Sequence, residues 1–215
     1  ITKLSFNAYS SCQEKDIILD SGGALGDKCG PLLIKKPTTI LDNNSLIAIP
    51  GKLTTANLLF KMAYPEMNNI KEILFSDIEH SVLSNNVQAG LIIHENRFTY
   101  HAKGLVKELD LGEFWARQTS LPLPLGGIMA SRSLDKSVQE KVNLLINLSI
   151  KYAFENPTSS INYTKLHCQE MDDVVIAAHI NLYVNKYSLS FGEAGKKAIK
   201  ALLSYSDEQS SNIFL

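Results

Sequence analysis

His94 combines a residue type and a position that suit acid–base catalysis. It follows the apolar run 89–93 and precedes Glu95 and Arg97. The run predicts a buried strand, and open α/β sheets bind ligands beyond the carboxyl ends of their strands. Because an imidazole has a pKa of about 6.5, His94 can exchange a proton near neutral pH. The alternative is a structural, partly buried histidine, with Glu95 and Arg97 as a surface pair.

Residues 50–56 suit the binding of an anion. They join a predicted strand, 45–49, to a predicted helix, 53–63, and Gly51 permits a tight turn between them. Backbone N–H groups at a helix start, together with the hydroxyls of Thr54 and Thr55, suit a carboxylate or a phosphate. The glycine and lysine spacing is not that of a P-loop. A threonine that only caps the helix is the alternative.

Lys3 and Ser5 lie on a predicted strand at residues 3–8 and provide a second set of polar groups. Lys3 can pair with an acid, and Ser5 can donate a hydrogen bond to one. An edge-strand lysine in water is the alternative. The glycine-rich stretch 21–26 does not have the spacing of a dinucleotide fingerprint and is predicted to be a turn. Residues 121–127, with two prolines and two glycines, suit a lobe crossing, a cleft wall or a plain loop.

Strand patterns that alternate with helical patterns must position these side chains. Strands are predicted at 30–34, 45–49, 71–75, 88–93 and 125–130. Helices are predicted at 53–63, 77–85, 112–119, 137–156, 161–168, 172–185 and 192–204. This order predicts an α/β fold with largely parallel sheets. We expect two lobes, residues 1–32 with 129–215 (lobe I) and residues 33–128 (lobe II), with a ligand cleft between them.

The composition excludes several classes of function. Lysine and arginine number 21 against 22 acidic residues, a net charge of −1, so no basic face indicates nucleic acid. The apolar runs are far shorter than the roughly 20 residues that cross a bilayer. Three widely spaced cysteines, Cys12, Cys29 and Cys168, favour free thiols in a reducing cytoplasm and offer no zinc-ligand spacing.

Several of these segments occur in an order that resembles a known family. They are Lys-Leu-Ser at 3–5, Ser-Gly-Gly-Ala-Leu-Gly at 21–26, Gly-Pro-Leu at 30–32, Ile-Pro-Gly-Lys-Leu-Thr-Thr-Ala at 49–56, the run 89–100 with His-Glu-Asn-Arg-Phe-Thr-Tyr, the run 121–127, and Gly-Glu-Ala-Gly at 192–195. Together they resemble 1,4-dihydroxy-6-naphthoate synthase, a lyase family of the futalosine route to menaquinone. The block at 94–100 is the most specific.

The resemblance implies a two-lobed, periplasmic-binding-protein-like fold of type II with a central cleft. It implies conversion of cyclic dehypoxanthinyl futalosine, a small molecule with a carboxylate, to 1,4-dihydroxy-6-naphthoate, with no metal or organic cofactor. The family's proton acceptor matches His94. Its substrate contacts match two short runs, Lys3, Leu4 and Ser5 on one lobe and Thr55 and Ala56 on the other.

The chain departs from the family at its start. The family's opening strand and its Ser-x-Cys-Pro-Asn-Asp-like loop are not found, and the chain opens on Ile1 within a predicted strand, so we expect an N-terminal strand region to be missing. Two other functions fit the same fold, a solute-binding receptor and a chorismate dehydratase. The block at 94–100 speaks against the dehydratase. The sequence predicts no oligomeric state.

Overall fold

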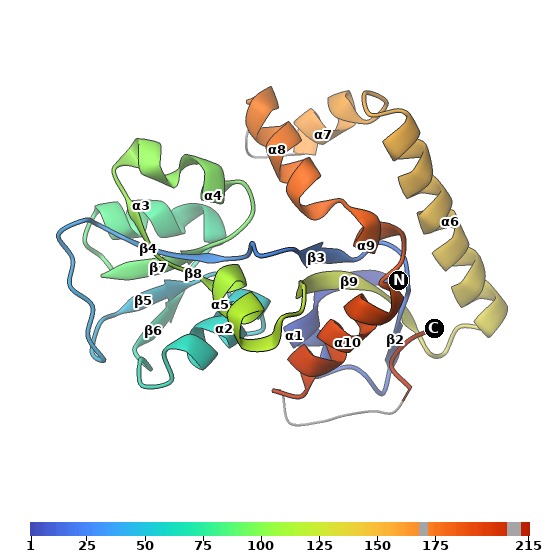
Figure 1. The fold of residues 1–215 in the computed structure, drawn as a ribbon, viewed down its shortest axis with the longest axis horizontal. Helices are drawn as coiled ribbons and strands as arrows, with labels where there is room; N and C mark the ends of the chain where they lie inside the picture. Colours follow the sequence, from blue (N-terminus) through green and yellow to red (C-terminus); the bar gives the residue numbers. More distant parts are fainter. Residues whose placement is uncertain (168–171, 206–211) are drawn as a thin grey trace. The chain divides into compact units, whose positions relative to one another are not determined.

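The chain folds into two compact units. The computed structural model describes residues 1–167, 172–205 and 212–215. Unit 1 combines Ile1–Leu25 with Pro124–Leu215, and unit 2 is Gly26–Leu123 (Figure 1). The chain passes between the units in two strands that pair with each other, β3 (Ala24–Gly26) and β9 (Leu123–Ser131). The predicted lobe boundaries fall after residues 32 and 128. The observed unit boundaries fall several residues earlier, after Leu25 and Leu123.

Unit 2 is built on a five-stranded sheet. Its strands lie in the order β6 (Ile70–Glu72), β5 (Ile47–Ile49), β7 (Ala89–Ile92), β4 (Leu32–Lys35) and β8 (Val106–Asp110). Strand β5 runs parallel to β6 and β7, whereas β4 runs antiparallel to β7 and β8. The prediction of a largely parallel sheet is therefore wrong. Helices connect β5 to β6 and β6 to β7, which gives parallel pairs, but a loop without a helix connects β4 to β5.

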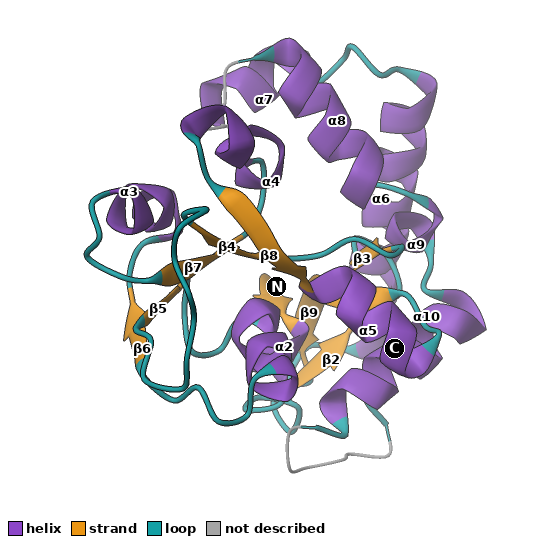
Figure 2. Cartoon of the chain, turned by 60° about the vertical axis from the view of Figure 1, so that its left-hand side comes forward, coloured by secondary structure: helices purple, strands orange, loops and turns teal. Residues whose placement is uncertain are grey.

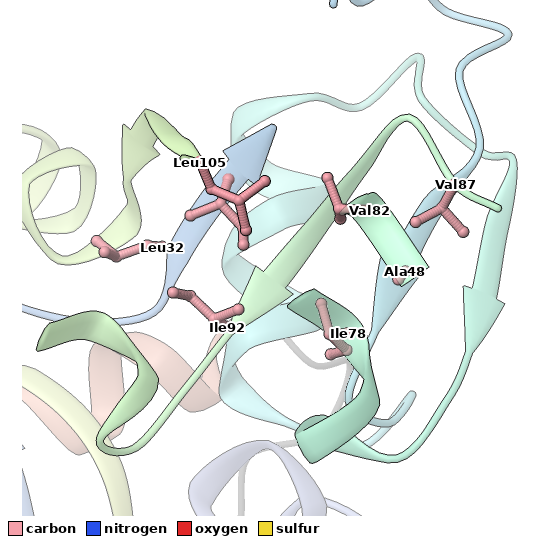
Figure 3. Close-up of a cluster of buried hydrophobic side chains, with 8 residues drawn as sticks. Leu32, Ala48, Ile78, Val82, Val87, Ile92 and Leu105 are labelled. Atoms are coloured by element: carbon pink, nitrogen blue, oxygen red, sulfur yellow. The ribbon is translucent and has the colours of Figure 1, made fainter. Parts of the chain in front are cut away.

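Short helices surround this sheet. They are α2 (Thr55–Ala63), the 3₁₀ turn η1 (Phe75–Asp77), α3 (Ile78–Leu83), α4 (Asn96–Thr99), the 3₁₀ turn η2 (Tyr100–Lys103) and α5 (Leu111–Thr119). Helix α3 packs closely on β7, because a Cβ atom at Gly90 would lie 2.3 Å from Cγ2 of Ile78. Ile78 and Val82 join strand residues such as Leu32 and Ile92 in a buried cluster (Figure 3). That cluster fixes the end of β7 against α3.

Unit 1 contains the second sheet. Strands β1 (Thr2–Ser5) and β2 (Asp16–Ile18) both pair antiparallel with β9, and β3 also pairs with β9. This sheet also contradicts the prediction of largely parallel strands. The predicted strand 3–8 ends early, since α1 (Phe6–Tyr9) follows β1 directly. The predicted turn at 21–26 includes β3, because β9 offers that segment a partner for its backbone.

The C-terminal part of unit 1 is helical, as predicted. Its helices are α6 (Lys136–Glu155), α7 (Ile161–His167), α8 (Asp173–Tyr183), α9 (Lys186–Leu189) and α10 (Gly192–Leu203). The helix predicted at 161–168 ends at His167, and Cys168 lies outside the described residues. Helix α10 contacts α1, where the buried rings of Phe6 and Phe191 meet edge to face, 5.9 Å apart. None of the described helices is long and apolar enough to cross a membrane.

Candidate active site

Three loops of unit 2 leave the same edge of the sheet. Because β5 is parallel to both β6 and β7, the carboxyl ends of these three strands face one way (Figure 2). The loop after β5 leads to Thr54 and helix α2, the loop after β6 leads to Phe75 at the start of η1, and the loop after β7 carries His94. This is the edge at which open α/β sheets bind ligands.

His94 is exposed and has an uncommon backbone conformation. Its φ angle is +58°, in the left-handed region. Histidine enters this region more often than most residues, but the conformation still costs free energy, and it occurs where the surrounding structure enforces it. The imidazole meets the ring of Phe75 at a centroid distance of 5.1 Å and an interplanar angle of 70°. An exposed imidazole therefore lies beyond the strand end with an aromatic ring beside it.

A buried carboxylate tethers the turn that follows His94. Glu79 of α3 is 3% exposed. Its Oε2 atom accepts hydrogen bonds from Nδ2 of Asn96 and from Nζ of Lys103, each at 2.6 Å. Charge-assisted hydrogen bonds of this kind are short and strong. The segment from Asn96 to Lys103 is thereby held against α3.

Arg97 braces the same turn from the other side. Its guanidinium donates to the carbonyl of Gly30 and forms an ion pair with Asp110, 2.7 Å from Nη2 to Oδ2. Asp110 is the N-cap of α5, and its Oδ1 atom accepts from the backbone of Gly112 at 2.8 Å. The Arg97 side chain is therefore part of the folded framework below His94.

The start of α2 provides a positive helix end at this edge. Thr54 is the N-cap, and its Oγ1 atom accepts from the backbone of Asn57 at 3.2 Å. Thr55 and Ala56 are buried in the first turn, which contains no acidic residue. Helix starts of this composition favour anions. The side-chain Oδ1 of Asn57 is buried and has no hydrogen-bond partner among the described residues.

Lys3, Leu4 and Ser5 lie in the other unit, on β1. They pair with Ile128, Gly127 and Gly126 of β9, in that order. A Cβ atom at Gly126 would lie 2.7 Å from the carbonyl oxygen of Leu4, so glycine permits this close pairing. Lys3 is exposed, and partial desolvation lowers the pKa of its ammonium group from the usual 10.5. The structure thus places His94, Thr55 and Ala56 after neighbouring parallel strands of unit 2, and the three β1 residues in unit 1.

Sequence patterns did not identify Phe75, Glu79 and Lys103 as members of this site. Phe75 was predicted to be the last residue of a strand. That position could have indicated a place near His94, because neighbouring parallel strands end at the same edge of a sheet. Glu79 falls within the helix predicted at 77–85, and no sequence pattern singles out Lys103. Within the described parts of the chain, no three His, Cys, Asp or Glu side chains gather as metal ligands would.

Comparison with known proteins gives the family. The menaquinone-biosynthesis family matches residues 1–208. The chain belongs to the menaquinone-biosynthesis family. Two proteins similar to this chain are 1,4-dihydroxy-6-naphthoate synthases. The protein from Thermus thermophilus is 40% identical over 202 residues, and the protein from Streptomyces coelicolor is 38% identical over 208 residues. Each match covers 94% of this chain and 74% of the relative.

Solved structures confirm the fold of this menaquinone-biosynthesis protein. A protein from Archaeoglobus fulgidus superimposes with a TM-score of 0.89 at 36% identity, covering 96% of this chain and 77% of that one. A Candida albicans protein described as having the generic periplasmic binding protein fold has a TM-score of 0.60 at 12% identity, covering 98% and 75%. The periplasmic-binding-protein-like α/β fold predicted from the sequence is therefore confirmed.

Proposed function

We propose that this protein is a 1,4-dihydroxy-6-naphthoate synthase that converts cyclic dehypoxanthinyl futalosine to 1,4-dihydroxy-6-naphthoate in menaquinone biosynthesis. The observation that carries the proposal is the identity of about two residues in five with two such enzymes along nearly the whole chain. The exposed His94 at the carboxyl end of β7 supports the same activity from the geometry.

His94 acts as the proton acceptor in this proposal. The reaction opens the substrate's ring system and releases the sugar-derived part, and removal of a proton starts it. An imidazole outside the strand end can reach a bound small molecule, and a general base of this type contributes about 10²–10⁴-fold in rate. The tethers through Glu79, Arg97 and Asp110 hold its turn in place before the substrate arrives.

The substrate's carboxylate is bound by groups of opposite charge. The positive start of α2 at Thr55 and Ala56 suits an anion, because first-turn N–H groups and the helix dipole both point toward it. Lys3 and Ser5 of β1 provide an ammonium and a hydroxyl, and Leu4 provides an apolar side chain for the aromatic ring. These contacts bind the substrate, whereas His94 performs the chemistry.

The reaction belongs to the cytoplasm in this proposal and needs no metal or organic cofactor. Cys12 and Cys29 are free thiols, as a reducing compartment favours. The protein's partner is the small-molecule substrate, and neither nucleic acid nor membrane takes part. Turnover should therefore survive dialysis against a chelator, whereas activity that returns only after metal is added would contradict this part.

The decisive experiment is turnover by purified protein. Cyclic dehypoxanthinyl futalosine is supplied, and 1,4-dihydroxy-6-naphthoate is quantified by liquid chromatography and mass spectrometry. We expect His94→Gln to lower kcat by about 10²–10⁴-fold. The control is His80→Gln on the exposed face of α3, which should keep wild-type kcat. Full turnover by His94→Gln would exclude His94 as the acceptor.

Two other outcomes would replace the proposed activity. Conversion of chorismate, without conversion of the cyclic futalosine derivative, would identify a chorismate dehydratase. Tight binding of a ligand without any turnover would identify a solute-binding receptor of the same fold.

A further inference from the structure

Phe75 and His94 reach each other across the end of β5. Phe75 follows β6 and His94 follows β7, and these two strands flank β5 on opposite sides. Adjacent strands lie about 4.8 Å apart, so the flanking strands are separated by roughly 10 Å. The ring centroids of Phe75 and His94 are nevertheless 5.1 Å apart. The two side chains therefore meet over the end of β5, the strand that leads to α2.

Phe75 is held at this place from both sides. The backbone N–H of Ile73 donates to the carbonyl of Ile49, the last residue of β5, at 3.1 Å. On the other side, Ile78 is fully buried and packs on Gly90 of β7. The chain between Ile73 and Ile78 is thus anchored at each end to the strands below. The backbone that carries Phe75 is therefore held in place, with the Phe75 ring against His94.

The Phe75 ring limits the conformations of the His94 side chain. It is exposed, and it starts from a left-handed backbone position. A side chain can occupy several rotamers, and a ring beside it excludes those that overlap the ring. The angle of 70° between the two rings is the edge-to-face arrangement that aromatic pairs prefer. The contact therefore restricts where the imidazole nitrogens point.

We propose that Phe75 is a positioning residue that holds the His94 imidazole in the orientation for proton transfer. The inference rests on the proposed function, because it concerns the base of that reaction. Phe75 acts through His94, so its loss should lower kcat rather than weaken substrate binding. A misplacement of about 1 Å at a reacting group can cost about 10²-fold in rate.

The test compares Phe75→Leu, Phe75→Tyr and a matched control in initial-rate assays on cyclic dehypoxanthinyl futalosine. We expect Phe75→Leu to lower kcat about 10–100-fold with KM changed less than twofold, and Phe75→Tyr to restore kcat to within about threefold. The control, Tyr64→Leu, removes a similar ring contact with Phe60, 5.6 Å away at the end of α2. It should leave kcat unchanged.

A second measurement does not depend on turnover. In the wild-type protein, the carbon-bound ring protons of His94 should show a ring-current shift in ¹H–¹³C NMR, and Phe75→Tyr should preserve it. Wild-type kcat in Phe75→Leu, or His94 signals without a ring-current shift, would overturn the proposal. If the wild-type protein leaves the substrate unchanged, the proposed function fails, and the NMR result still decides whether Phe75 orients His94.

Discussion

Asp110 and Arg97 form a largely buried ion pair that joins the turn after His94 to the start of α5. Their side chains are 1% and 18% exposed, and Oδ2 lies 2.7 Å from Nη2. The second carboxylate oxygen of Asp110 caps α5 through the backbone of Gly112 and Glu113. One side chain therefore stabilises both a helix start and the segment that carries the proposed base.

Replacing Asp110 by asparagine should be strongly destabilising. The amide keeps a capping oxygen but leaves the Arg97 guanidinium inside the unit without its counter-charge. Breaking one partner of a buried pair costs about 3–5 kcal/mol of unfolding free energy, which urea unfolding measures. The control is Glu113→Gln, which breaks the exposed pair with Lys107 and should cost less than about 1 kcal/mol. Equal, small losses in both variants would show that the buried pair adds little.

The left-handed backbone of His94 predicts an order of stability among inactive variants. A Cβ atom costs about 1–2 kcal/mol in this conformation, and glycine avoids that cost. His94→Gly should therefore unfold at a higher temperature than His94→Ala, although both lose turnover. Ser120, the C-cap of α5 with φ +57°, is the matched position. Ser120→Gly should likewise exceed Ser120→Ala in thermal stability, with activity intact. The reverse order at position 94 would argue against a left-handed His94.

Lys3 should make substrate affinity depend on alkaline pH. Desolvation lowers the pKa of its ammonium from 10.5, so Lys3 loses its proton at lower pH than an ordinary lysine. KM should rise as pH increases through that pKa, because the neutral amine no longer attracts the carboxylate of the proposed substrate. Lys3→Gln should raise KM about 10–100-fold at pH 8, since hydrogen bonds to charged groups contribute about 1.5–3 kcal/mol. In Lys3→Arg, KM should stay constant to a higher pH than in the wild-type protein. A rise of KM over the same pH range in both proteins would exclude Lys3 as the cause.

Tyr9 should limit stability in strong alkali. Its ring is fully buried and its hydroxyl donates to the carbonyl of Asp16, 3.1 Å away. Burial raises its pKa from 10 to about 12. Its folded-state pKa is raised, so its contribution to stability is complete below pH 10 and is lost as pH rises toward 12. Chemical unfolding between pH 9 and 12 should show a steeper decline for the wild-type protein than for Tyr9→Phe. Parallel curves would contradict a raised Tyr9 pKa.

Local patterns predicted the parts of the fold that depend on local residues. The turn between β5 and α2 and the long helix α6 follow from apolar spacing and from turn residues. Strand β8 was not predicted, because its sequence Val-Lys-Glu-Leu-Asp is largely exposed and its partner among the described strands is the distant β4. The antiparallel direction of β4 was missed for a similar reason, since strand direction depends on how the chain crosses the sheet.

In the candidate site, too, residues that depend on neighbouring sequence could be predicted, whereas residues that depend on distant contacts could not. His94 and the start of α2 could be predicted, because each follows an apolar strand directly. The bonds from Glu79 to Asn96 and Lys103 span 17 and 24 residues. No pattern in a single sequence encodes such pairs, because they form only after α3 has packed on β7. Phe75 became part of the site only when the strand order brought β6 and β7 to either side of β5.

Unit 2 is inserted into the sequence of unit 1. The two ends of the inserted segment lie on the neighbouring strands β3 and β9. The chain enters unit 2 through β3 and leaves it through β9, and adjacent strands lie about 5 Å apart. A short glycine linker could therefore replace all of Gly26–Leu123, or join the two ends of that segment when it is expressed alone. Domain grafting is thus possible, in which the whole segment that bears His94 is exchanged between related proteins.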